Sequence, residues 1–168
     1  MATSATIRHD YVEARIFAHI ATLTITGSPT LEHADVPRQG SVSTDPRLRV
    51  SFRPLDPRRR GKFSATQSAL DMAQLVVIDL FFPGGDDGAA FNLHTPAQAA
   101  ADLQADLQYL TLSFLDYTVP AAPVVVSDAS IRITRPVSVR RLPITDGLRR
   151  HQVRATVEWI GRVDDSFA

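Results

Sequence analysis

The chain has 168 residues and a mass of 18.4 kDa, which suits one domain with a single hydrophobic core. Hydrophobic residues make up 44% of it and charged residues 21%, a composition typical of folded proteins rather than disordered ones. Its 18 basic and 18 acidic residues give a net charge of zero. No overall electric field therefore draws the chain to nucleic acid or to an anionic membrane, and any charge-driven contact must be local.

The residue types narrow the chemistry further. There is no cysteine, which excludes disulfides, thiolate nucleophiles and cysteine metal sites. The first residues lack the apolar core of a cleaved signal peptide, and no apolar run approaches the roughly 18 residues of a membrane span. We therefore expect a soluble protein that is made in the cytoplasm and has no membrane partner. The basic residues are 17 arginines and one lysine, and the planar, five-donor arginine head suits protein interfaces.

Apolar residues recur every three or four positions from Ile7 to Leu23, which predicts an amphipathic helix. The segment Gly27–Pro46 contains three further prolines or glycines and reads as a loop with room for one short strand. A loop this long usually contacts a partner or carries function. Apolar and polar residues then alternate over Arg47–Arg53, which predicts a strand with one buried face and one basic face.

Prolines at positions 54 and 57 should end that strand, because proline removes a hydrogen-bond donor from the ladder. An exposed basic turn is then expected, formed by Arg58, Arg59, Arg60, Gly61 and Lys62. The segment Ala69–Phe82 predicts a long central strand that is covered on both faces along its second half. An acidic, glycine-rich connection follows, which holds Asp86 and Asp87.

The next helix has the strongest local signals. Thr95, Pro96 and Gln98 have the spacing of a capping box with proline at the first helical position. A stripe of leucines and one phenylalanine carries the helix to about Asp116. Two acidic side chains lie off this stripe and should face solvent: Asp102 and Asp106.

The last third of the chain predicts strands. Short candidates at 124–126, 131–133 and 137–139 are interrupted by Pro136 and Pro143. Asp146-Gly147 is a strong hairpin signal, and Gln152–Val163 alternates cleanly with Trp159 on its apolar side. Together these elements predict an α+β fold in one domain, with a central mixed or antiparallel sheet flanked by two main helices.

No catalytic constellation accompanies these elements. The phosphate-loop pattern and the nucleophile-elbow pattern are both absent. The five histidines have no second ligand at the spacing of a metal site, and they lie in separate elements: His9, His19, His33, His94 and His151. The acidic glycine run lacks the later oxygen ligands of a calcium loop. We therefore predict no catalytic residue, no metal and no cofactor. The basic turn is the one segment suited to phosphate, although a solvated loop tip is favoured because no aromatic residue is interleaved.

The order of elements resembles the tail-terminator proteins of long-tailed bacteriophages. The resemblance runs through the N-terminal helix, the proline-studded loop and four further elements: Leu48–Phe52 preceded by Arg47, Leu75–Phe82, Thr95–Asp116 and Val153–Trp159. It implies a central sheet flanked by helices and a six-membered ring seated on the last ring of the tail tube. Such a ring stops tube polymerisation and presents the surface that joins the head. The protein would then be a structural, non-enzymatic part of the virion.

The resemblance also implies partners: further copies of the chain, the tail tube protein, a head-completion or neck protein, and DNA passing through the lumen. A ring needs a heterologous interface, for which we expect arginines of one subunit to pair with Asp86 and Asp87 of the next. Those arginines are Arg47, Arg49 and Arg53. The basic turn, Arg58-Arg59-Arg60 with Lys62, would reach a partner or the lumen. A head-to-tail connector, a tail tube subunit, a DNA-binding module and an enzyme remain as alternatives.

Overall fold

The computed structural model describes residues 9–36, 46–62, 67–83, 94–113, 117–118, 125–126, 130–133, 137–145 and 148–164. These residues form two helices, a seven-stranded sheet and a separate two-stranded pair, β5 (Tyr117–Thr118) with β6 (Val125–Val126). The predicted α+β fold class is confirmed, and the sheet is mixed.

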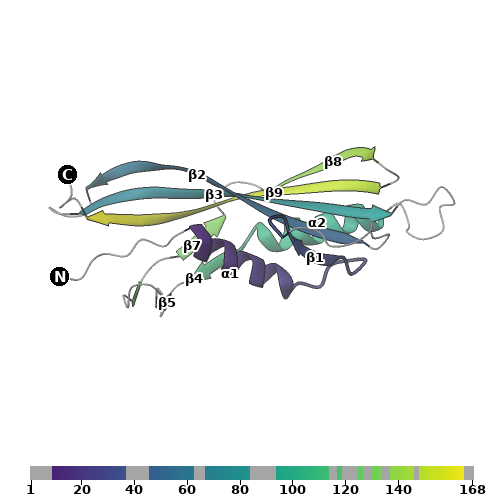
Figure 1. Cartoon of the computed structure of the whole chain (residues 1–168), viewed down its shortest axis with the longest axis horizontal. Helices are drawn as coiled ribbons and strands as arrows, with labels where there is room; N and C mark the ends of the chain where they lie inside the picture. The colour runs from purple at the N-terminus through teal and green to yellow at the C-terminus, as the bar shows by residue number, and fades with distance from the viewer. Residues whose placement is uncertain are drawn as a thin grey trace.

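Three long strands dominate the molecule (Figure 1). They are β2 (Arg47–Lys62), β3 (Gln67–Pro83) and β9 (Leu148–Asp164), and β3 pairs antiparallel with both of the others. The predicted strands Arg47–Arg53, Ala69–Phe82 and Gln152–Val163 are thus present, but each strand is longer than its local signal.

Short strands extend the sheet on both sides. β1 (Thr30–His33) lies parallel to the start of β2, inside the segment expected to be mostly loop. On the far side of β9, β8 (Ser138–Thr145) pairs with its first half and β7 (Ser130–Ile133) pairs near residues 157–158. β4 (Thr111–Ser113) lies outermost against β7.

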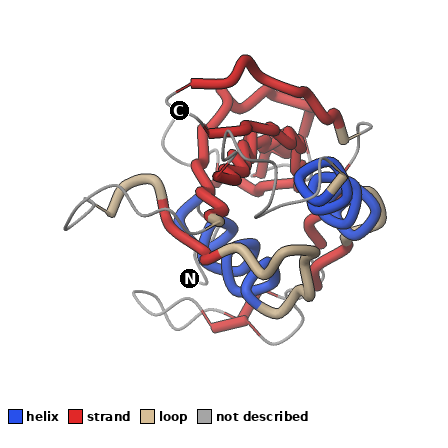
Figure 2. The backbone as a smooth tube through the Cα atoms, turned by 90° about the vertical axis from the view of Figure 1, so that its right-hand side faces the viewer, coloured by secondary structure: helices blue, strands red, loops and turns tan. Residues whose placement is uncertain are grey.

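Both helices lie on the same side of the sheet, as Figures 1 and 2 show. α1 (His9–Ala21) buries Val12, Ile16 and Ile20, and α2 (Thr95–Leu107) buries mainly alanines and leucines. Alternate residues of β3 face them and are buried: Met72, Gln74, Val76, Ile78, Leu80 and Phe82. We call this helix-covered side of the sheet the inner face.

The opposite side of the sheet, which we call the outer face, is open. Leu75, Val77 and Phe81 of β3 lie on it and are only half-buried. No helix among the described residues covers them. The prediction that the second half of β3 is covered on both faces is therefore wrong, because the chain places both helices on one side.

β2 also differs from the prediction. It runs on through Pro54 and Pro57 to Lys62, so the segment Arg58–Gly61 is a strand and not a turn. Beyond residue 50, no described strand pairs with the edge of β2 that faces away from β3. A proline there loses no strand-to-strand hydrogen bond on that edge, because no neighbouring strand needs its N–H. Register shifts between Leu55 and Arg58 and between Arg59 and Gly61 take up the extra residues.

α2 differs at both ends. Its N-cap is His94, which makes no side-chain cap hydrogen bond, so Thr95 is not the cap of a capping box. The helix ends at Leu107 rather than near Asp116, because the chain turns and enters β4. The pairing of β4 with β7 outweighs the local helical pattern. Leu110, which belongs to the predicted apolar stripe, therefore lies beyond the end of the helix.

The C-terminal strands follow the prediction with one exception. Thr145 pairs with Leu148, as the predicted tight hairpin requires, although Asp146 and Gly147 lie outside the described residues. β8 continues through Pro143, which was expected to interrupt it. β8 is paired on one side only within the described chain, so proline is tolerated there.

Candidate interaction surface

The outer face collects arginines from three strands. Residues directly opposite each other in a sheet point to the same side, so the register fixes which side chains share this face. Among the residues whose side chains the structure describes, it carries seven arginines: Arg47, Arg49, Arg53, Arg58, Arg140, Arg150 and Arg154. Four carboxylates lie among them: Glu32, Asp71, Asp79 and Glu158. Arginines therefore outnumber acids on this face.

One end of the outer face is built around Phe81. The guanidinium carbons of Arg47 and Arg150 lie 5.2 and 5.0 Å from the centre of its ring, within the range of a cation–π contact. Arg47 is only 7% exposed. Its Nε and the Nε of Arg150 are buried, and neither has a hydrogen-bond partner among the described residues. This arrangement holds two cations close together against one aromatic ring.

A polar chain crosses the outer face next to Phe81. Arg154 Nε donates to Gln152 Oε1 at 2.7 Å, and Gln152 Nε2 donates to Asp79 Oδ1 at 2.9 Å. Arg150 lies 4.0 Å from the same carboxylate oxygen. Asp79 of β3 thus binds side chains of β9. Its single negative charge offsets only part of the positive charge of the arginines around it.

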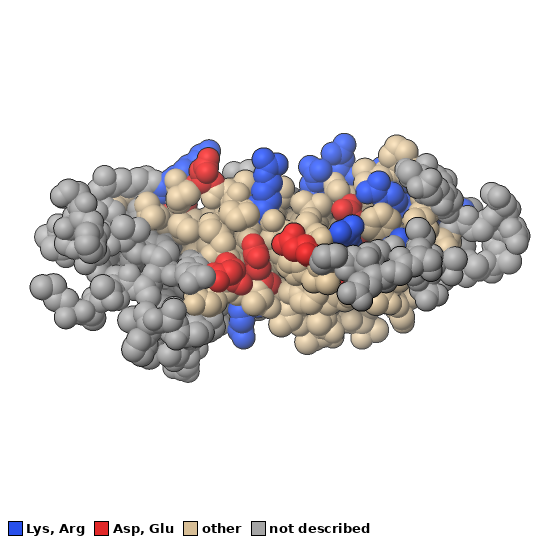
Figure 3. Space-filling model, in the orientation of Figure 1, with Lys and Arg blue, Asp and Glu red and all other residues tan. Residues whose placement is uncertain are grey.

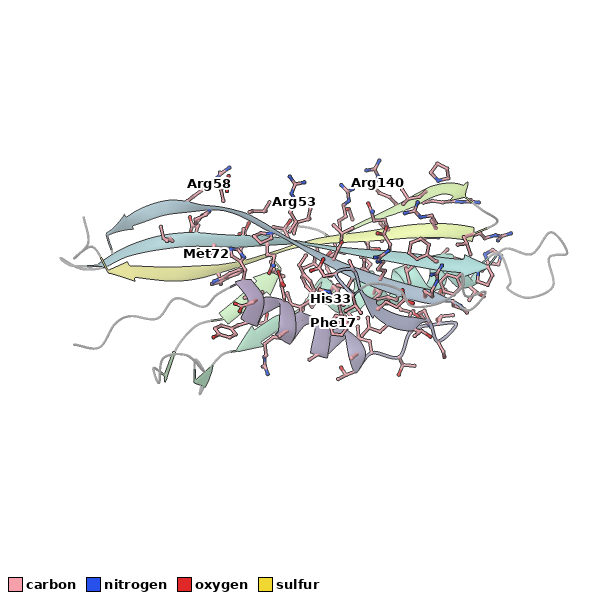
Figure 4. The ribbon with its side chains drawn as sticks, viewed as in Figure 1. Phe17, His33, Arg53, Arg58, Met72 and Arg140 are labelled. Atoms are coloured by element: carbon pink, nitrogen blue, oxygen red, sulfur yellow. The ribbon has the colours of Figure 1, made fainter. Side chains whose placement is uncertain are left out.

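The remaining arginines point outward. Arg49, Arg53, Arg58, Arg140 and Arg154 are exposed. Figure 4 shows Arg53, Arg58 and Arg140 projecting from the sheet on the side away from the helices. In the space-filling view, basic side chains line the upper rim of the molecule over β2 and β8, and acidic ones gather below them (Figure 3).

The helices carry the opposite charge. α1 and α2 contain Asp10, Glu13, Asp102 and Asp106 but only one cation, Arg15. Their exposed surface is otherwise mostly alanine: Ala14, Ala18, Ala21, Ala97, Ala101 and Ala105. We call this exposed surface of α1 and α2 the helix layer.

Two aspartates of α2 that were expected to face solvent instead bind neighbouring segments, Asp102 the loop after α1 and Asp106 α1 itself. Asp102 accepts hydrogen bonds from Thr26 N at 2.9 Å and Thr26 Oγ1 at 2.6 Å, and from Gln98. Burial raises the pKa of Asp102, but these hydrogen bonds outweigh it, so the pKa is lowered overall. Asp106 Oδ2 lies 2.7 Å from His19 Nε2 of α1. Both carboxylates are held in place on the helix side.

Two of the histidines pack against aromatic rings on the inner face of the sheet. His9 makes an edge contact with Trp159, and His33 lies between Phe17 and Phe52. Burial lowers the pKa of His9. The pKa of His151 is lowered by burial and also by the positive charge of Arg141. Within the described residues, no three histidine, aspartate or glutamate side chains gather as a metal site would require.

A cavity of about 310 Å³ opens where α1 meets β1. Its walls are apolar and hydroxyl side chains, among them Ile20, Leu31, Leu48, Thr24 and Ser28. No titratable side chain lines it, so it offers no group for acid–base chemistry.

The structure brings together four of the predicted interface residues, Arg47, Arg49, Arg53 and Arg58. Arg59, Arg60 and Lys62 lie in β2 with undescribed side chains, and Asp86 and Asp87 lie outside the described residues. Local sequence patterns missed Arg140 and Arg150, because only the pairing of β8 and β9 with β3 places them beside β2. Arg154 lies on the same side of β9 as Arg150 and Gln152, opposite the apolar side that was predicted around Trp159.

Comparison with known proteins identifies a similar fold but no protein family. No protein-family model and no curated protein matches this chain. Among the solved structures that are similar, one has a TM-score of 0.54 and 15% identity over 91% of this chain and 96% of its own. Its name states no function. The similarity shows a shared fold.

Neither helix within the described residues is long and apolar enough to cross a bilayer.

Proposed function

We propose that this chain is the subunit of a ring that caps the tail tube of a long-tailed bacteriophage. The ring would stop tube polymerisation and present the surface to which the head is joined. The order of elements that resembles tail terminators motivates this proposal, and the α+β fold is compatible with it. The role is structural, so no catalytic residue, metal or cofactor is needed.

The observation that carries the proposal is the open outer face. A sheet that exposes Leu55, half-exposes Leu75 and Val77, and lines them with arginines is suited to contact with another macromolecule. Arginine and aromatic side chains are enriched in such contacts, and the outer face carries both, with Phe81 between Arg47 and Arg150. An enzyme instead needs a pocket of converging titratable groups. The cavity beside α1 contains no such group.

The test is negative-stain electron microscopy of the purified chain mixed with headless tail tubes from the same source. We expect a cap on one end of each tube and tubes of fixed length. Bare ends that continue to grow would contradict the proposal and favour a head-side connector. Tubes formed by this chain alone would identify a tube subunit instead.

A further inference from the structure

Two surfaces of the chain are unlike and lie on opposite sides of the sheet. We propose that the outer face of one subunit binds the helix layer of the next, so that the ring closes by head-to-tail packing of sheet on helices. This inference rests on the proposed function, because it names the partner of the outer face within the ring.

Charge favours this pairing. Among the described side chains, the outer face carries seven arginines against four carboxylates. The helix layer carries Asp10, Asp102 and Asp106 against Arg15, while the remaining helix carboxylate, Glu13, faces the sheet and accepts a hydrogen bond from Gln74. The net charge of the whole chain is zero, so it does not reveal that positive and negative side chains lie on different surfaces. Placed against each other, the two surfaces match in sign, which favours correct docking and suppresses wrong partners.

Shape favours it as well. The exposed positions of α2 include Ala97, Ala101 and Ala105, one on each successive turn. Small side chains let a neighbouring sheet approach the helix backbone closely. Layers of helix on sheet are a stable way to bury an apolar sheet face. The outer face offers Leu55, which is 37% exposed, and half-buried apolar side chains between its arginines.

The two symmetric alternatives are disfavoured. Outer face against outer face would bring arginines opposite arginines, and helix layer against helix layer would bring carboxylates opposite carboxylates. Like charges in contact cost several kcal/mol. Only the mixed arrangement avoids both, and a mixed, heterologous contact is the kind that generates a ring.

The test uses two variants of the full chain, each blocked on one surface. In the first, Arg53→Glu and Arg140→Glu reverse two exposed charges of the outer face. In the second, Ala97→Arg and Ala101→Arg place bulk and positive charge on the helix layer. All four positions are exposed, so circular dichroism should show folded protein. Arg141→Glu, next to Arg140 but on the other side of β8, is the matched control.

Native mass spectrometry and sedimentation provide the readout. We expect each blocked variant alone to lose self-association by at least about 100-fold, while Arg141→Glu assembles as the unmodified chain does. An equal mixture of the two variants should form a dimer and nothing larger, because it contains one intact pair of surfaces. High salt should weaken that dimer.

Three results would overturn the inference. Full assembly of the helix-blocked variant alone would indicate contact between outer faces. Full assembly of the sheet-blocked variant would show that the outer face is not used. A mixture that stays monomeric at high concentration would exclude the pairing altogether. If the unmodified chain still caps tail tubes in any of these cases, the proposed function stands without this interface. A mixed dimer from a chain that caps no tubes would retain the interface and remove the function.

Discussion

Leu80 and Phe81 are neighbours in sequence, yet they belong to different environments. Leu80 points to the inner face and is fully buried under the helices. Phe81 points to the outer face, where two arginines contact its ring. The same alternation repeats along β2, β3 and β9. The inner face buries the apolar side chains that stabilise the fold. The outer face keeps arginines and half-buried apolar side chains at its surface, and it is the face for which we propose contact with another subunit.

The largest difference should come from truncating a leucine on each face. Leu80→Ala removes a side chain that is 0% exposed, and a buried Leu→Ala change costs about 2–5 kcal/mol. Leu75→Ala, on the half-buried outer face, should cost about 1 kcal/mol. Urea unfolding of the two variants under conditions that prevent assembly measures the difference. Equal losses would contradict the distinction between the faces.

A buried polar contact on the inner face should have the next largest effect. Gln74 is 0% exposed and its Nε2 donates to Glu13 Oε1 at 2.5 Å. Glu13→Ala leaves this amide without its acceptor and should lower the free energy of unfolding by about 1–3 kcal/mol. Adding Gln74→Met should recover most of the loss, because both polar partners are then gone. No recovery would show that the cost arises elsewhere.

Acid should weaken the inner side through His151. Burial and Arg141 lower its pKa below 6.5 in the fold, so the unfolded chain binds a proton first. Its contribution to stability is complete above pH 6.5 and is lost as the pH falls from there through the lowered pKa. His151→Leu should flatten this part of the stability curve, measured by thermal unfolding between pH 5 and about 8. An unchanged slope would assign the pH dependence to other groups such as His9.

The smallest effect should come from the outer arginines. Arg53→Ala removes an exposed side chain, and such changes usually alter the free energy of unfolding by less than about 0.5 kcal/mol. The same variant should weaken ring assembly, which makes it a probe of the outer face rather than of the fold. A loss of stability above 1 kcal/mol would mean that Arg53 supports the subunit itself.

Sequence patterns could predict most of the fold because alternation and helical spacing are local. They predicted the strands around Val50, Ile78 and Val157, the two helices and the hairpin at 146–147. They placed the end of β2 and the end of α2 wrongly, because pairing between distant segments decides those ends. β2 tolerates its prolines only because its far edge is unpaired.

The candidate surface was partly predictable for the same reason. Alternation in Arg47–Arg53 placed three arginines on one strand face. The position of Arg140 and Arg150 beside them depends on the register of β8, β9 and β3, which no local pattern encodes. That both helices cover one side of the sheet, and leave the other open, is likewise a property of the tertiary fold.

The most direct measurement uses the absence of cysteine in this chain. Ser51→Cys places a single thiol on the outer face and Ala101→Cys places one on the helix layer. With a short bis-maleimide, the doubly substituted chain should give a ladder of cross-linked species that ends at the closed ring. Each single variant should stay mostly uncross-linked. Efficient dimers from Ser51→Cys alone, or no cross-link in particles that cap tubes, would contradict the claim that the outer face is the subunit interface.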